Sequence, residues 1–206
     1  MFTPLQRRYL ISLLLFASAL VAGCASTRLT DSWSDPGFTG GPFKKWIVVA
    51  VGGNTVATRT LEDVMVGRLK AHGVDAVQGY QFLSSGRASE QQLDGAVVAS
   101  GAQALMLVHL RRVETRTQVT TAVVPVGGRG FGWGGVYGGW VSVPDVQQYQ
   151  VATVETTVYQ VAQRRLVWSG VTQTFDPSSI ATEAPGFSEI ILGELAQHGL
   201  VPAVTG

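Results

Sequence analysis

Apolar residues in the first half of the chain follow two patterns, first an uninterrupted run and then helical spacing. The run Lys45–Val51 is followed by apolar residues at helical intervals up to Gly73. An uninterrupted run indicates a strand buried on both faces, and helical spacing indicates an amphipathic helix, for which Asn54 or Thr58 is the expected cap. A short strand at residues 74–78 completes a βαβ unit, and such units have right-handed crossovers.

The rest of the chain alternates between strand and helix patterns. A helix is expected from Ser89, where Gln92 completes a capping box, to about Ser100. The remaining expected elements are strands at residues 104–121, 148–162 and 166–175 and an amphipathic helix at residues 187–198. The order β-α-β-α-β-β-β-α predicts a single α+β domain over residues 45–206, with a mixed β-sheet and helices packed mainly on one face.

The first residues follow the pattern of a signal peptide. A basic pair precedes an apolar run at residues 9–21, which is shorter than the roughly 20 residues needed to span a bilayer. The run ends at Gly23 and Cys24 in the letters LVAGC, which resemble the lipobox of bacterial lipoproteins. We predict a signal peptide at residues 1–23, cleavage before Cys24, and acylation of its thiol and amine by fatty acids such as palmitate. An ordinary secretory signal is the alternative, and the basic pair is compatible with twin-arginine as well as general export.

Lipidation at Cys24 restricts the chemistry and the location of the mature chain. Cys24 is the only cysteine, so acylation leaves no thiol for a disulfide, a metal or a nucleophile. It is followed by Ala25 and Ser26, and resemblance to the sorting signals of Gram-negative lipoproteins implies the outer membrane, facing the periplasm. Residues 24–44 are rich in Ser, Thr, Gly and Pro and are predicted to form a tether that spans at most ~65 Å, with its second half against the domain.

The charge balance argues against nucleic acid as a partner. The full chain has a formal charge of +1, and loss of Arg7 and Arg8 with the signal peptide leaves −1. Proteins that bind nucleic acid carry clusters of basic residues, and this sequence has none. We therefore expect its partners to be the membrane, through the anchor, and an envelope protein or polymer.

Four short stretches resemble a family of uncharacterised bacterial outer-membrane lipoproteins. They are SDP at residues 34–36, VETTVY at 154–159, LVWSG at 166–170 and FDPSS at 175–179. In this family a Gly/Tyr-rich loop precedes both the ETTVY-like strand and the LVWSG-like hairpin. The resemblance implies a lipoprotein without established catalytic residues. The order of elements also looks like the amino-terminal domain of TolB, which is an analogy of fold and not of activity.

A glycine- and aromatic-rich loop is predicted at residues 127–145. Gly130, Gly132 and Gly135 match the dinucleotide fingerprint G-x-G-x-x-G, and Glu155 follows at a suitable distance. However, β-branched residues, glycines and a proline follow in place of the helix whose amides would bind the phosphates. We therefore expect no nucleotide site and no cofactor.

Three roles are open for this loop. It is a mobile connection between antiparallel strands, a contact surface, or an element that enters the membrane interface, where aromatic rings are favoured. The aromatic residues that would form the possible interaction surface are Phe131, Trp133, Tyr137 and Trp140.

The residues that usually perform catalysis or bind metals are scattered. The three histidines have no second ligand at suitable spacing, so no metal site is expected: His72, His109 and His198. Ser169 and the pair Ser178–Ser179 lack a nucleophile elbow, so no catalytic residue is predicted. We expect the protein not to be an enzyme.

A polar stripe lies on one expected strand face. Arg112, Glu114 and Arg116 alternate along a strand, and Glu155 lies on a neighbouring one. They would form either a polar binding groove or cross-strand charge pairs on a solvated face. Trp168 is expected to pack in the core or on the sheet.

The sequence therefore predicts a membrane-anchored periplasmic lipoprotein without enzymatic activity, which binds a protein or polymer in envelope assembly, export or maintenance. The alternative is a periplasmic small-ligand-binding or enzymatic domain, with its site between the sheet and the glycine-rich loop.

Overall fold

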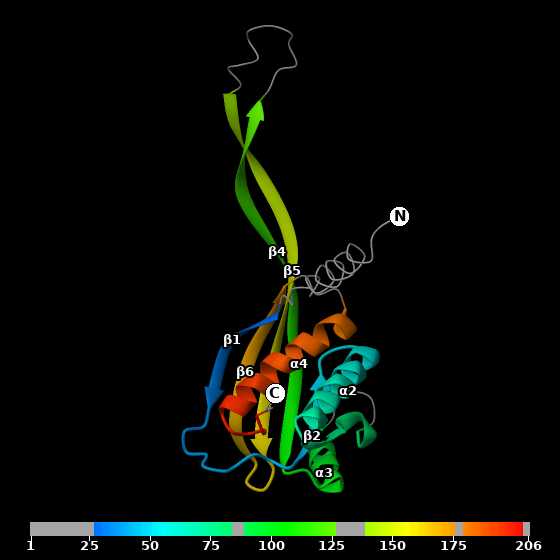
Figure 1. Ribbon diagram of the computed structural model, residues 1–206. Coiled ribbons are helices and arrows are strands. Elements are labelled where there is room, and N and C mark those ends of the chain that lie inside the picture. Colours follow the sequence, from blue (N-terminus) through cyan, green and yellow to red (C-terminus); the bar gives the residue numbers. More distant parts are fainter. Residues whose placement is uncertain (1–26, 84–88, 127–138, 176–178, 204–206) are drawn as a thin grey trace, which may run out of the picture.

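The computed structural model describes residues 27–83, 89–126, 139–175 and 179–203. Within these residues six strands form one sheet in the order β1-β6-β5-β4-β2-β3 (Figure 1). The strands are β1 Thr27–Ser34, β2 Lys45–Val51, β3 Asp75–Gln78, β4 Ala104–Val126, β5 Gly139–Gln160 and β6 Arg165–Phe175. β2 pairs in parallel with β3 and β4, and the other neighbours are antiparallel, so the sheet is mixed as predicted.

The helices of the described residues cover both faces of the sheet unequally. They are α2 Thr55–Ala71, α3 Glu90–Ser100 and α4 Ile180–Gln197, and a 3-10 turn, η1 Gly79–Gln81, follows β3. α2 and α4 lie on the same face (Figure 1) and pack on alternate residues of β2 and β4. α3 packs on the intervening residues, which point to the opposite face. The predicted α+β class, with helices mainly on one face, is confirmed.

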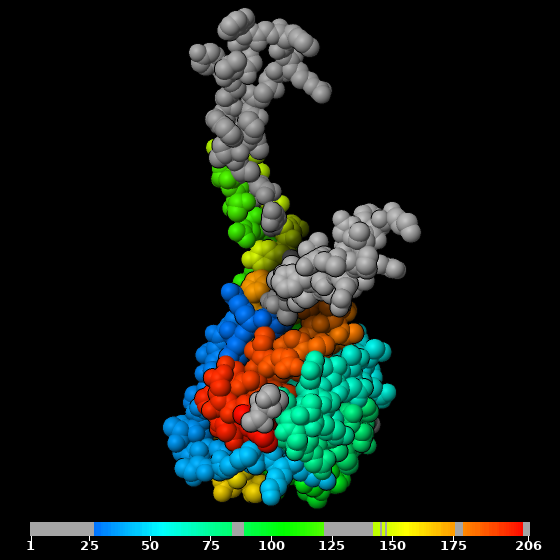
Figure 2. All heavy atoms as spheres, in the orientation of Figure 1, coloured from blue at the N-terminus to red at the C-terminus, as the bar shows by residue number. Residues whose placement is uncertain are grey.

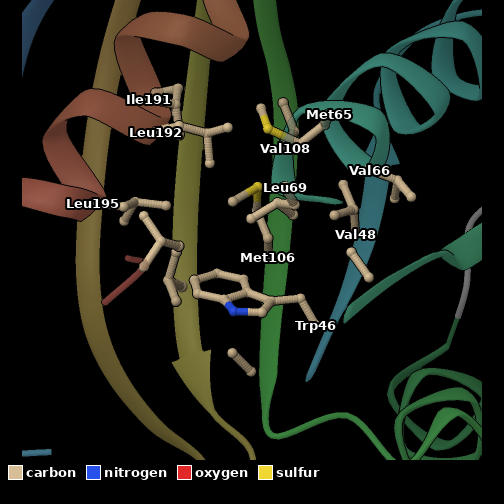
Figure 3. Packing of buried hydrophobic residues seen from close by; sticks show 14 of the residues in the cluster. Trp46, Val48, Met65, Val66, Leu69, Met106, Val108, Ile191, Leu192 and Leu195 are labelled. Atoms are coloured by element: carbon tan, nitrogen blue, oxygen red, sulfur yellow. The ribbon is translucent and has the colours of Figure 1, made fainter. Parts of the chain in front are cut away.

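The main core lies between the sheet and the layer of α2 and α4 (Figure 3). Its buried side chains include Trp46, Val48, Met65, Leu69, Met106, Val108, Ile191, Leu192 and Leu195. Trp46 is fully buried, and its Nε1 donates a hydrogen bond of 3.1 Å to the carbonyl of Phe43. Trp46 thus buries its ring while its one polar atom keeps a partner.

Capping residues set the helix boundaries much as the sequence indicates. Asn54 Oδ1 accepts the N–H of Ala57 at 2.8 Å, and Ser89 and Gln92 form the predicted capping box. Each helix ends close to a glycine with positive φ, a conformation that costs glycine least: Gly73 at 75°, Gly101 at 63° and Gly199 at 68°. The predicted ends of α2, α3 and α4 are confirmed.

α4 begins earlier than predicted. The sequence favours a start at Phe187, since a proline inside a helix lacks one hydrogen-bond donor. In the structure Ser179 caps the helix, which begins at Ile180 and contains Pro185. Ala184 and Phe187 are both buried against the core. Their burial outweighs the missing hydrogen bond.

The segment predicted as a tether contains a strand. Within residues 24–44, Thr27–Ser34 forms β1, which pairs antiparallel with β6 at the edge of the sheet. Its sequence TRLTDSWS is mostly polar, which is common in edge strands and hides the element from a hydrophobic pattern. The second half of the segment lies against the domain as predicted, because Phe43 is buried beside Trp46, with ring centroids 5.7 Å apart.

Candidate functional site

The strands β4 and β5 extend beyond the rest of the sheet. β2 leaves β4 at the pair Val51 and His109, and β6 leaves β5 at the pair Phe175 and Val151. Further out, β4 and β5 pair only with each other among the described residues. We call this two-stranded ribbon, Thr115–Val126 with Gly139–Gln150, the arm.

The arm is long and stands clear of the domain. Its two strands form 12 register pairs, from Thr115 with Gln150 to Val126 with Gly139. At about 3.4 Å per residue, the arm measures ~40 Å. Figures 1 and 2 show that it projects past the helices, which cover only the lower sheet. Hairpins of two strands are marginally stable alone in water, so the arm gains little stability from its own pairing.

The arm is nearly free of charge. Arg116 and Asp145 are the only charged residues of its two strands. Its basal half is rich in Thr and Gln, whereas Ala122–Val126 reads AVVPV and Gly139–Val143 reads GWVSV. Exposed strands of soluble proteins usually carry more charge, because charge discourages further pairing.

The base of the arm lies beside the start of β1. In the adjoining row of the sheet, Thr27, Thr174, Ala152 and Val113 are successive register partners across four strands. The predicted lipidation site, Cys24, precedes Thr27 by three residues, which span at most ~10 Å. The chain between a lipid at Cys24 and the arm end of the domain is thus much shorter than the tether that the sequence predicts.

The predicted loop at residues 127–145 is only partly described. Its last seven residues, 139–145, belong to β5 and not to a loop, since each pairs with a residue of β4. Trp140 is opposite Pro125 in this ladder. The other aromatic residues of the possible interaction surface lie outside the described residues, as do Gly130, Gly132 and Gly135 of the fingerprint: Phe131, Trp133 and Tyr137.

The polar stripe at the base of the arm consists of charge pairs. Glu114 contacts Arg112 at 2.8 Å and Arg116 at 3.3 Å. Glu155 instead pairs with Arg111, which a β-bulge between Leu110 and Arg112 inserts into β4. The distances thus support charge pairing over a binding groove, but only the pair of Arg111 with Glu155 crosses between strands, whereas Glu114 pairs along its own strand and not across the sheet as predicted. Exposed pairs of this kind contribute about 0–1 kcal/mol each.

A buried carboxylate that the sequence analysis missed connects α2 to the sheet. Glu62 is 3% exposed; its Oε1 accepts the N–H of Ala50 and its Oε2 that of Tyr80, both at 2.9 Å. Burial raises the pKa of Glu62, and the two N–H groups oppose that change. The signal was in the sequence, because Glu62 precedes the buried Val66 and Leu69 at helical spacing.

Polar neighbours of Glu62 also have partners. Tyr80 Oη donates to Asp63 Oδ1 at 2.6 Å, which raises the pKa of Tyr80, and Arg59 lies 5.3 Å from the centre of the Tyr80 ring. Although ligands often bind at this carboxyl end of parallel strands, these groups satisfy one another. We interpret the cluster as structural.

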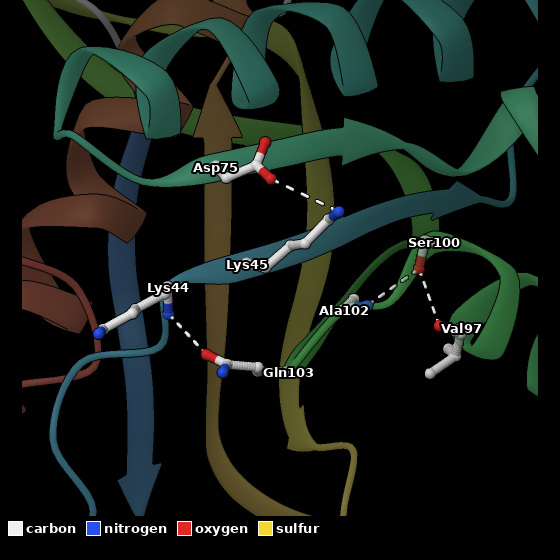
Figure 4. Close-up of polar contacts among 7 residues, drawn as sticks. All are labelled: Lys44, Lys45, Asp75, Val97, Ser100, Ala102 and Gln103. Atoms are coloured by element: carbon white, nitrogen blue, oxygen red, sulfur yellow. Dashed lines mark hydrogen bonds and ion pairs between the residues drawn. The ribbon is translucent and has the colours of Figure 1, made fainter.

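A shallow cavity of about 520 Å³ lies at the opposite end of the sheet from the arm. It is lined by Phe38, Gly40, Gly41, Pro42, Phe43, Lys44, Ala102, Gln103, Gln160, Val161 and Ala162. Gln103 Oε1 accepts the N–H of Lys44 at 2.9 Å, and Ser100 holds the neighbouring turn through Val97 and Ala102 (Figure 4). Lys44 is its only charged side chain, so the lining offers no acid–base pair.

The histidines and serines considered as metal ligands or nucleophiles lie on different elements of the fold. His72 and His198 cap the ends of α2 and α4 as predicted, and His109 lies in β4. Ser169 is in β6 and Ser179 caps α4, whereas Ser178 lies outside the described residues. No group of three possible metal ligands occurs in the described ranges. Those ranges also contain no helix long and apolar enough to span a membrane.

Trp168 packs in the core, as predicted. It is fully buried, and a Cβ atom at Gly170 would approach its ring to 2.4 Å. The glycine of the LVWSG stretch therefore makes room for the tryptophan. Trp168 and Gly170 of this motif thus serve packing.

Comparison with known proteins gives only distant likenesses of fold. No protein-family model and no curated protein sequence matches the chain. The PelC dodecamer from Paraburkholderia phytofirmans aligns with a TM-score of 0.44 and 15% identity, over 80% of this chain and 94% of that one. Lipoprotein GNA1162 from Neisseria meningitidis aligns with a TM-score of 0.42 and 10% identity, over 74% and 98%. The motif resemblance and the likeness to TolB stay predictions.

Proposed function

We propose that the chain is a lipoprotein of the cell envelope, anchored at Cys24 in the outer membrane and facing the periplasm. In this proposal it has no enzymatic activity and binds a protein or polymer partner through the arm. The binding serves the assembly, export or maintenance of cell-envelope components. The arm does not need a large interface for this, because a ribbon with two open edges can bind an extended partner that pairs with it as a further strand.

The observation that carries the proposal is the arm itself. Twelve register pairs extend beyond the sheet with only two charged residues, although nothing in the domain core requires them. The short chain between Cys24 and Thr27 also supports the proposal, because a lipid on Cys24 would bring the membrane close to the base of the arm. A partner at or near the membrane is therefore within its reach.

The experiment is site-specific photo-crosslinking in live cells. A photo-reactive residue replaces Gln118 or Gln148, which are exposed on the arm, and in a control replaces the exposed Lys70 on α2. We expect both arm positions, and not Lys70, to recover the same protein or glycan. Recovery of lipid alone, or equal recovery from all three positions, contradicts partner binding by the arm.

Fatty-acid labelling tests the anchor independently. The full chain is expected to incorporate labelled palmitate and to sediment with outer membranes, and Cys24→Ser abolishes both. Labelling that survives in Cys24→Ser contradicts the predicted site of lipidation.

A small-ligand site is the second candidate, and the cavity near Phe43 is the observation that favours it. That cavity lies at the end of the sheet remote from the arm, and not between the sheet and the glycine-rich loop. A thermal-shift screen separates the candidates, because a ligand in this cavity would stabilise the domain even after removal of the arm.

A further inference from the structure

The two outer edges of the arm, one on β4 and one on β5, have the same length and opposite strand directions. β4 and β5 have equal lengths there, run antiparallel, and pair without a bulge from Thr115 with Gln150 onward. In a two-stranded ribbon each strand bonds its partner on one side and directs its other N–H and C=O groups outward. No third strand of the described residues pairs with either edge of the arm. Each edge is therefore a template for a further strand.

The basal half of the arm lacks the usual protection against such pairing. Thr115–Val119 contains one charge, and Val146–Tyr149 contains none. Val119 and Val146 are register partners, and they are 65% and 57% exposed. Segments rich in β-branched and Gln residues, with little charge and no proline, are those that most readily add strands.

The outer half of the arm is less suitable. Pro125 of β4 and Pro144 of β5 each lack the N–H that a continuing ladder would need. A ladder formed by the arm is thus restricted to its basal half, a length typical of strands in globular proteins.

We propose that neighbouring copies of this chain pair edge to edge through their arms, Thr115–Val119 of one copy with Val146–Tyr149 of the next. The inference rests on the proposed function, because lipid anchors hold all copies in one orientation and concentrate them on one surface. When two arms point the same way, β4 of one copy meets β5 of the next antiparallel, as within a single arm. Antiparallel contact of β4 with β4 would instead require arms that point in opposite directions, and with arms that point the same way it would be the less stable parallel pairing.

The charges of the arm agree with this arrangement. Arg116 belongs to β4, and Val146–Tyr149 of β5 carries no charge, so contact between unlike strands places Arg116 against an uncharged segment. Contact between two β4 strands would bring two arginines together, which is unfavourable. The proposed interface joins different surfaces of the two copies, and it therefore repeats until a ring closes or a filament forms.

The test uses two full-length copies with different affinity tags, expressed together. One carries Thr117→Cys on β4 and the other Gln148→Cys on β5, positions that are exposed in the structure. Cys24 is the only native cysteine and is expected to be acylated, so a thiol crosslinker reports on the new cysteines. Separate copies are needed because Thr117 and Gln148 are register partners within one arm.

We expect a crosslinked dimer with both tags in the membrane fraction. Its yield should exceed by at least tenfold that of a control pair, Lys70→Cys with Val98→Cys, which are exposed on α2 and α3. A mixed dimer no more abundant than this control overturns the proposal.

A charge on the exposed edge should break the contact. Val119→Lys adds a second cation to the same segment of β4 as Arg116, and we expect it to lower the yield of mixed dimer at least tenfold. Val98→Lys is the matched control, because Val98 is 80% exposed on α3, and it should leave the yield unchanged. Thermal unfolding confirms beforehand that the Val119→Lys variant and the unsubstituted protein are both folded. Equal yields of mixed dimer from the two proteins then overturn the pairing.

Failure of this inference differs from failure of the proposed function. If Cys24 is acylated and the arm crosslinks to another envelope component while mixed dimers are absent, self-pairing is wrong and the proposed function stands. If Cys24 is not acylated, the anchor is wrong, and mixed dimers of the purified chain that also carries Cys24→Ser then decide the pairing by themselves.

Discussion

The strand β5 passes through two regions of the molecule that depend on different interactions. Val158 lies in the domain, where β4 and β6 flank it and the helices bury it completely. Val146 lies on the same strand in the arm, pairs only with β4, and is 57% exposed. The same hydrogen-bonded pairing of β4 with β5 thus lies beside a hydrophobic core in the domain and without one in the arm. Burial therefore stabilises the domain, whereas the arm depends mainly on the hydrogen bonds between its two strands.

The largest effect is expected from the domain core. Trp168→Ala removes a fully buried ring that Gly170 accommodates, and we expect a loss of about 4 kcal/mol in the free energy of unfolding. Urea unfolding followed by circular dichroism measures it. Trp33→Ala is the control, because Trp33 is 47% exposed on β1. Equal losses for both tryptophans would mean that the core is not where the structure places it.

Glu62→Ala should rank next. The substitution leaves the buried N–H groups of Ala50 and Tyr80 without their acceptor, and unmet buried donors cost about 1–3 kcal/mol each. We expect a loss of about 3 kcal/mol in the same measurement. Lys70→Ala, on the exposed side of the same helix, is the control. A loss below that of the control would show that Glu62 does not hold α2 to the sheet.

The pH dependence of stability offers a sharper test of this carboxylate. Burial raises the pKa of Glu62, so the folded chain binds this proton more tightly than the unfolded chain does. Its contribution is present at low pH and is lost as pH rises from the ordinary glutamate pKa, about 4.3, through the raised value. Glu62→Gln cannot titrate, so its stability relative to the native chain should increase over this window. A decrease would contradict the direction of the pKa shift.

The domain was largely predictable because its helices and strands carry local signals. The capping box at Ser89, the cap at Asn54 and the glycine at Gly73 each act within a few residues, so the sequence shows them. β1 was missed because a polar edge strand is stabilised by pairing with β6, a partner more than 130 residues away. Such a contact leaves no periodicity in the strand itself.

The candidate site was less predictable than the fold. The sequence places strands at residues 104–121 and 148–162, yet it does not show that they continue and pair without any covering helix. Alternation of polar and apolar residues indicates a strand but not which strands lie beside it. The arm is defined by that second property, since in the described part of the chain its two strands pair only with each other. In the same way, the bulge at Arg111 redirects Glu155 away from the predicted stripe. A bulge changes register without a strong signal in the sequence.

A pair of identical substitutions on β5 tests the comparison directly. Val158→Ala should cost about 2 kcal/mol of unfolding free energy, because it leaves a small cavity in the core. Val146→Ala should cost less than about 0.5 kcal/mol, because the side chain is mostly exposed and lies outside both core clusters. Thermal unfolding of the two variants provides the measurement. Similar costs would show that the arm and the domain unfold as one unit.

Removal of the whole arm, the largest change to the chain, should have only a small effect on stability. Glu114 and Val151 are register partners, so replacement of residues 115–150 by Asn-Gly closes β4 and β5 with a two-residue hairpin turn. No buried core residue lies in the described part of the removed stretch. We expect the shortened chain to fold with an unfolding free energy within about 1 kcal/mol of the native value, since burial supplies most stability. Crosslinks to partners and mixed dimers should nevertheless disappear. A loss of several kcal/mol would mean that the arm supports the domain, and the separation of the two regions would then be wrong.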